Sequence, residues 1–247
     1  MIRIDINVPQ SWGELSQLQL EQLLRILSTV GGLSAGQSVM TQVALYCVMK
    51  WNNISSLCPV SNGWIIRIGN VSGAISSELL AALTESMCWL RESPKQPVRI
   101  DSIDGCRAAA ADLDDDTAFD TWLSCETLWQ QYQLNSNIEL LRRMSQLLYK
   151  GVKEFREWQL IGVFFWWAGI KALCNELYPN FFRPAETQST MSNESFRRGI
   201  DAQIRALTKG DITKEEKVLA MPCHRALTEL DALAREYEEL KRKYMKK

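Results

Sequence analysis

Hydrophobic and polar residues alternate with a period of two in three short stretches of the first half of the chain. These stretches are residues 2–6, 64–68 and 98–103, and such alternation predicts β-strands. The second follows Asn62-Gly63, a dipeptide that favours tight hairpin turns, so we expect it to pair with the run before it. We expect the three strands to form one small sheet.

Most of the remaining apolar residues recur at helical spacing, which predicts that the protein is mainly α. Ser11 with Glu14 resembles a capping box at the first helix, and Asp115 or Asp116 and Thr213 are the expected caps of later helices. The predicted helices cover residues 15–28, 38–51, 78–90, 119–132, 138–150, 155–177, 195–209 and a region from 213 that Pro222 divides. The predicted fold class is mainly α (α+β): a multi-helix core, a small minor sheet and a C-terminal coiled-coil-like helix.

Residues 119–182 form the most aromatic part of the chain and include five tryptophans. Within it, residues 160–174 are apolar almost all round, which is typical of a helix enclosed by other helices. This run holds Lys171 and is shorter than the roughly 20 residues that span a bilayer. We therefore predict the central helix of a folded core, with no membrane insertion.

The last helix carries a regular apolar seam that steps by four and three residues, as in a coiled coil. The seam is the candidate partner interface, and it consists of Ala226, Leu230, Leu233, Tyr237, Leu240 and Tyr244. It either packs back on the domain or contacts another chain, including a second copy. The expected organisation is a main domain over residues 1–182, a linker over 183–194 and a C-terminal helical segment over 195–247.

Composition and charge are those of an ordinary globular protein, with 46% apolar residues and a net charge of −1. This balance gives no whole-chain attraction to nucleic acid or anionic lipid, although Lys241, Arg242 and Lys243 make the C-terminus basic. The seven cysteines have no paired spacing, so we expect buried free thiols. Together with the absence of a leader-like N-terminus, they predict a cytoplasmic protein.

No motif predicts a catalytic, metal or cofactor site. Gly31, Gly36, Gln37 and Ser38 approach a phosphate-binding loop but lack its lysine, so we expect a loop after a helix end. The only histidine, His224, has no sequence neighbour that would orient it for catalysis.

The acidic run that contains Asp112, Asp114, Asp116 and Asp120 does not fit a calcium loop. We interpret it as a helix start, and a carboxylate-dependent enzyme built on these residues is the alternative hypothesis. A nucleic-acid accessory that uses the basic C-terminal helix is a further alternative.

Several segments together resemble a loose group of helical proteins from bacterial prophages and related phages. They are IDINVPQSWGELSQLQLEQL, DLDDDTAFDTWLSCETLWQQY, WWAGIKALCNELYPNFF and EEKVLAMPCHRALTELDALAREYEE. The resemblance implies a non-enzymatic interaction protein without a cofactor, such as a tail-assembly chaperone or accessory that binds another structural protein of the phage. It assigns no functional residue.

Overall fold

The computed structural model describes residues 6–31, 36–114, 117–183 and 193–245 and confirms the mainly helical fold class. The helices are α1 (Gln17–Thr29), α2 (Gln37–Trp51), α3 (Ser77–Glu85), α4 (Phe119–Asn135), α5 (Ile138–Leu148), α6 (Glu157–Leu177), α7 (Asn193–Thr208), α8 (Glu215–Leu219) and α9 (Cys223–Met245). The strands are β1 (Ile54–Val60), β2 (Gly63–Ile68), β3 (Val71–Ile75), β4 (Ser102–Ile103) and β5 (Cys106–Arg107), and the short 3-10 turns are η1 (Trp12–Glu14), η3 (Cys88–Arg91) and η4 (Ile212–Lys214).

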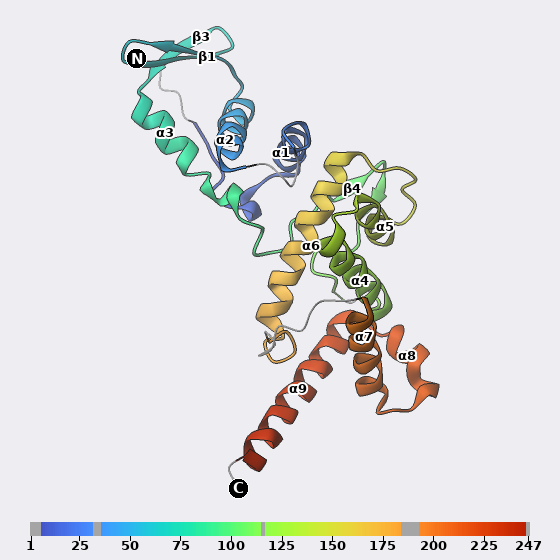
Figure 1. Ribbon diagram of the computed structural model, residues 1–247. Coiled ribbons are helices and arrows are strands. Elements are labelled where there is room, and N and C mark those ends of the chain that lie inside the picture. The colour runs from blue at the N-terminus through green and yellow to red at the C-terminus, as the bar shows by residue number, and fades with distance from the viewer. Residues whose placement is uncertain (1–5, 32–35, 115–116, 184–192, 246–247) are drawn as a thin grey trace.

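The elements follow one another along an elongated molecule (Figure 1). The sheet of β1–β3 lies at one end with α2 and α3, and α4, α5 and α6 form the middle. The helices α7, α8 and α9 form the other end, where α9 carries the C-terminus away from the body. The predicted linker lies largely outside the described residues, so the division at residue 183 stays a prediction.

The sheet confirms the predicted hairpin and corrects the choice of its third strand. Strands β1 and β2 pair antiparallel across the turn, and β3 then pairs with the other edge of β2. Gly63 has a φ of +135°, and a Cβ there would collide with the carbonyl oxygen of Ile75. A short strand with an internal glycine, VSGAI, gave no alternation signal, which is why β3 was missed. The strand predicted at 2–6 lies almost wholly outside the described residues.

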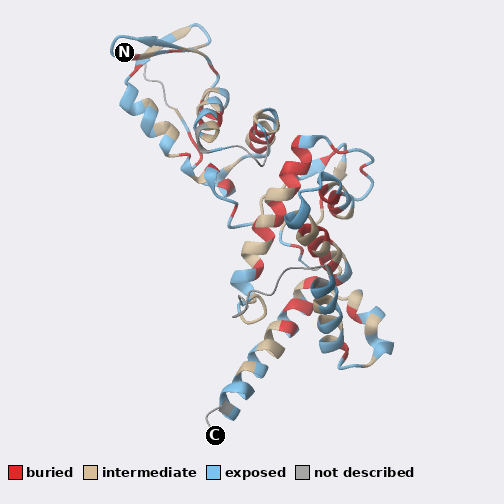
Figure 2. Cartoon of the chain, in the orientation of Figure 1, coloured by how far each residue is buried: buried red, intermediate tan, exposed pale blue. Residues whose placement is uncertain are grey.

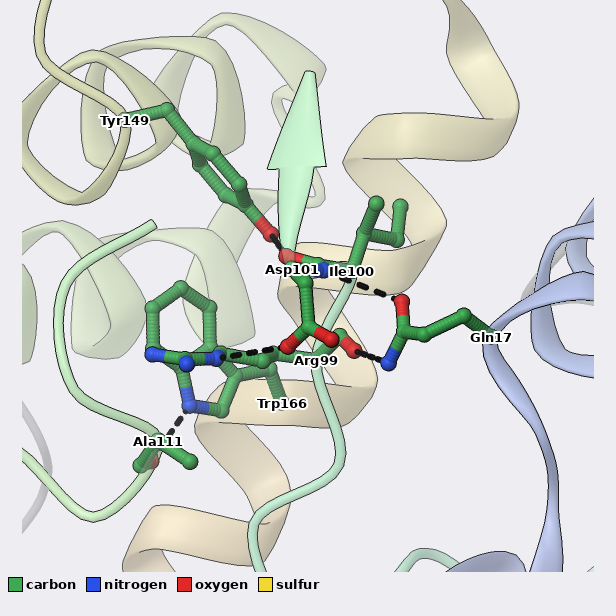
Figure 3. Close-up of polar contacts among 7 residues, drawn as sticks. All are labelled: Gln17, Arg99, Ile100, Asp101, Ala111, Tyr149 and Trp166. Atoms are coloured by element: carbon green, nitrogen blue, oxygen red, sulfur yellow. Dashed lines mark hydrogen bonds and ion pairs between the residues drawn. The ribbon is translucent and has the colours of Figure 1, made fainter. Parts of the chain in front are cut away.

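The strand predicted at 98–103 is wrong for most of its length, because only β4 is a strand. In place of a neighbouring strand, this segment hydrogen-bonds to a side chain of α1 (Figure 3). The Gln17 amide donates to the carbonyl oxygen of Arg99 at 3.0 Å and accepts from the backbone N–H of Asp101 at 3.0 Å. Tyr149 donates to the intervening carbonyl of Ile100 at 2.7 Å. The segment is therefore extended, but it is fixed between helices.

The helix caps differ from the predicted ones. The capping box of α1 is formed by Ser16 and Gln19, whereas Ser11 precedes the short turn η1 and makes no side-chain cap bond. At η4, the side chain of Asp211 accepts from the backbone N–H of Thr213, so Thr213 is capped and is not the cap. The predicted caps of α4, Asp115 and Asp116, lie outside the described residues.

Helix α6 is the core helix that the sequence predicted, and it is longer than its apolar run. Over 21 residues it is long and apolar enough to cross a membrane by length and composition alone. In the fold it packs against α1 and α5, and Trp166 and Trp167 are fully buried. Lys171 of α6 contacts the buried Glu126 of α4 at 2.7 Å, and Trp167 donates to the same carboxylate at 3.3 Å.

Two glycines of α6 allow other parts of the chain to approach this helix closely. A Cβ at Gly162 would lie 3.0 Å from side-chain atoms of both Ile100 and Leu24. A Cβ at Gly169 would collide with the backbone of Gln96 and would lie 2.9 Å from the Cα of Pro97. Because backbone atoms cannot move aside as a flexible side chain can, the contact at Gly169 requires a residue without a Cβ.

We predict that Gly169→Ala destabilises the protein by about 1–3 kcal/mol, the usual cost of overpacking a core. The measurement is chemical denaturation followed by tryptophan fluorescence. Gly199→Ala in α7 is the control, because its Cβ would meet no atom within 4 Å. The control should be neutral or stabilising, since alanine favours a helix over glycine. Equal stability of the two variants would contradict the close approach.

We also predict that Lys171→Met costs about 2–3 kcal/mol, because it leaves the Glu126 carboxylate buried without its cation. This value is below that of a fully buried pair because the Lys171 side chain is 21% exposed. The double variant Glu126→Gln/Lys171→Met should recover part of the loss, and Lys150→Met on the surface should change little. Thermal unfolding measures all three, and a double variant no more stable than Lys171→Met would contradict this role of the charge.

Candidate functional site

Helix α9 begins at a backbone bridge to the start of α4. Phe119 N–H donates to the carbonyl oxygen of Met221 at 2.8 Å, and Cys223 N–H donates to that of Thr117 at 2.8 Å. The first N–H groups of a helix have no partner within the helix, so this bridge satisfies one such group at the start of each. Pro222 lies between α8 and α9, where the sequence predicted a break.

The predicted seam of α9 is divided into a buried and an exposed half. Ala226 and Leu230 are 0% and 4% exposed in the core, in the region where α9 contacts α4 and α7. Leu233 is half-buried, whereas Tyr237, Leu240 and Tyr244 are 66%, 52% and 76% exposed. Figure 2 shows this change along α9, from buried near its start to exposed near the C-terminus. We call Leu233, Tyr237, Leu240 and Tyr244 the distal stripe.

The chain after α6 packs against α9 on another side of the helix. The Asp231 carboxylate accepts the backbone N–H groups of Asn180 and Phe181 at 2.7 and 3.0 Å, and the side-chain amide of Asn180 at 2.9 Å. Farther along, Arg183 contacts Glu238 at 3.4 Å. Because successive residues are turned by about 100° around a helix, Asp231 and Glu238 lie about 150° and about 130° from the middle of the distal stripe. This contact leaves the stripe uncovered.

Beyond the exposed Arg235, charged residues form two blocks on α9. Glu236, Glu238 and Glu239 form an acidic block, and Lys241, Arg242 and Lys243 form a basic block one turn farther on. The basic end lies at the C-terminus of the helix, where positive side chains stabilise the helix dipole. The distal stripe thus runs along α9 past an acidic region and then a basic region.

The aspartates predicted as an alternative catalytic site do not share one pocket in the described residues. Asp112 and Asp114, both exposed, border a pocket of about 550 Å³ with Tyr178 and His224. His224 Nδ1 lies 3.8 Å from Asp114 Oδ1 in this pocket. Asp120 borders a different pocket, beside Glu215 of α8. Asp116 lies outside the described residues.

No described group of three or more His, Cys, Asp and Glu side chains is arranged to hold a metal ion. The seven cysteines are free thiols, but the expectation that they are buried fails for Cys58 and Cys88, which are exposed. Burial raises the pKa of Cys47 and Cys223 to about 12, so these thiols stay protonated and unreactive near neutral pH.

Comparison of the chain with protein-family models, curated proteins and solved structures found no match.

Asp231 is a site residue that sequence patterns did not indicate, and it gives a pH-dependent prediction. Burial alone would raise its pKa, but hydrogen bonds from Asn180 and Phe181 outweigh this effect and hold the pKa below its usual value. A lowered folded-state pKa stabilises the protein above the ordinary pKa of about 4, and this stabilisation is lost as the pH falls through the folded-state value. We predict that Asp231→Ala costs about 1–2 kcal/mol at neutral pH and less under acidic conditions.

Thermal unfolding between pH 3 and 7 measures this difference, and hydrogen exchange at Asn180 and Phe181 should accelerate in the variant. Asp201→Ala is the matched control, because Asp201 is exposed on α7 and the change raises helix propensity equally. A destabilisation by Asp231→Ala that did not change with pH would show that the charge of Asp231 contributes nothing.

Proposed function

We propose that the protein is a non-enzymatic interaction protein of the phage or prophage kind, acting as a tail-assembly chaperone or accessory that binds another structural protein. The observation that carries this proposal is the distal stripe: α9 leaves the core after Leu230 and presents Tyr237, Leu240 and Tyr244 to solvent. Tyrosines are enriched in protein interfaces, where one side chain supplies both apolar area and a hydrogen-bonding group.

The partner surface that fits this stripe is an amphipathic helix or a groove of matching length. Its apolar face would cover Tyr237, Leu240 and Tyr244, and its charges would oppose the order of the acidic and basic blocks along α9. The first two turns of α9 are fixed in the core by Ala226 and Leu230. Because an anchored helix is already ordered, a partner would not bear the cost of forming it.

The phage assignment rests on the resemblance of the sequence segments quoted above. That resemblance is to helical proteins, and the fold is mainly helical. Nucleic acid is a weaker alternative partner, because the acidic block of Glu236, Glu238 and Glu239 adjoins the basic end of α9 and offsets its attraction for phosphate.

A pull-down against the structural proteins encoded near the gene tests the proposal. Full-length protein should retain one of them, and Leu240→Glu/Tyr244→Glu should lose that partner, because the new carboxylates would be buried unpaired in the interface. A parallel gene deletion should reduce the number of normal virions.

The matched control for the pull-down is Tyr46→Glu/Leu79→Glu. These residues are also a tyrosine and a leucine, 62% and 54% exposed, but they lie on α2 and α3. The control should keep the partner. If the unaltered protein retains no virion component and the deletion leaves virions normal, the proposal is wrong. DNA binding at low salt that disappears when residues 241–247 are removed would instead favour the nucleic-acid alternative.

A further inference from the structure

The distal stripe has the spacing of a two-stranded coiled coil. From Leu233 to Tyr244 its residues step by four, three and four, which places one row of apolar side chains along the helix. This part of α9 is about 18 Å long, since a helix rises 1.5 Å per residue. A second helix lying along the stripe would cover it without contacting the chain near Asp231 and Glu238, which lies on another side of α9.

The order of the charged residues along α9 indicates which helix fits. Glu236, Glu238 and Glu239 precede the middle of the stripe, and Lys241, Arg242 and Lys243 follow it. Another copy of α9 in the opposite direction would place its basic block against the acidic block of the first, and its acidic block against the basic one. A parallel copy would place the two acidic blocks at the same level along the helices, and likewise the two basic blocks, which is unfavourable except where Glu236 faces Lys241.

We propose that the distal stripe pairs with the same stripe of a second copy of this chain, in antiparallel orientation. This inference rests on the proposed function, because it names an occupant of the same interaction surface. Tyr237 packs against Leu240 of the second copy, and Leu233 packs against its Tyr244. Each pairing occurs twice because the contact is symmetric, so the assembly closes as a dimer.

Antiparallel pairing also defines which charged residues border the apolar layers. Glu236 lies next to Lys243 of the second copy, and Lys241 lies next to Ala234, whose small side chain accommodates the lysine stem. In a parallel dimer, Glu236 would instead face Lys241. The two orientations therefore predict different partners for one glutamate, and charge exchange can distinguish them.

The size of the contact predicts a weak, reversible dimer. Two helices that share about three turns form an interface at the low end of specific protein contacts. The dimer should therefore dissociate on dilution in the micromolar range, and a partner helix of higher affinity could replace the second copy. This exchange would reconcile self-association with the proposed role as a chaperone or accessory.

Sedimentation equilibrium of the full-length chain over micromolar concentrations tests the dimer. Reductant must be present, because the exposed Cys58 and Cys88 could form intermolecular disulfides. We expect a monomer–dimer equilibrium whose dissociation constant rises about ten-fold or more in Leu240→Glu. Leu79→Glu, at a similarly exposed leucine of α3, should leave it unchanged. A monomer at every concentration, or equal effects of both variants, would overturn the proposal.

Charge exchange then tests the orientation. Glu236→Lys should weaken the dimer, and Glu236→Lys/Lys243→Glu should restore it. Glu236→Lys/Lys241→Glu should not restore it. Restoration by the Lys241 exchange alone would overturn the antiparallel arrangement. Because the charged residues are exposed, circular dichroism should show the same helix content in all variants, so that changes report association.

The pull-down distinguishes this inference from the proposed function. A monomeric protein that still retains a virion component through the distal stripe would refute the dimer and support the interaction role. A dimer that retains no virion component would support self-association alone and count against the proposed function.

Discussion

The close approach of residues 96–101 to α6 is the constraint on which the arrangement of the molecule depends. Gly169 brings the backbone of Gln96 against the helix, and Gly162 brings the side chains of Ile100 and Leu24 against it. Gln17 and Tyr149 then fix the backbone of this segment by hydrogen bonds from two sides (Figure 3). The sheet end of the molecule is therefore attached to the core helix through an extended segment and α1. This attachment depends on the lack of a side chain at Gly162 and Gly169 as much as on side-chain contacts.

The C-terminal helices are attached differently, through the backbone bridge between the starts of α4 and α9. From this bridge, one continuous apolar row on α9 first contributes to the core and then continues outside it. The row changes from buried to exposed where α9 extends beyond the neighbouring helices, and not where its sequence becomes polar. The same pattern thus stabilises the fold through Ala226 and Leu230 and leaves Tyr237 and Leu240 for association.

Periodicity was enough to predict the helices and the β1–β2 hairpin, because local sequence dominates both. It failed for residues 98–103, whose alternation is real but whose hydrogen-bonding partner is the side chain of Gln17, 82 positions away. The spacing of the seam was predictable, but its division was not, because burial of Leu230 and exposure of Tyr237 depend on where other helices end. Asp231 could not be found either, since an aspartate inside a charged helix resembles any solvated residue until Asn180 and Phe181 are placed beside it.

The bridge between α4 and α9 has a consequence for the order in which the chain can fold. The bridge joins segments that are far apart in the sequence. Beside it, the Cys223 thiol donates to the carbonyl oxygen of Leu113, which lies 110 residues earlier. Closing a loop of this length costs about 4 kcal/mol of chain entropy before any contact compensates for it. Helices α4, α5 and α6, which are connected in sequence and pack on one another, lower this cost by shortening the effective loop. Docking of α9 is therefore expected to be a late step in folding, after the tryptophan-rich centre has formed.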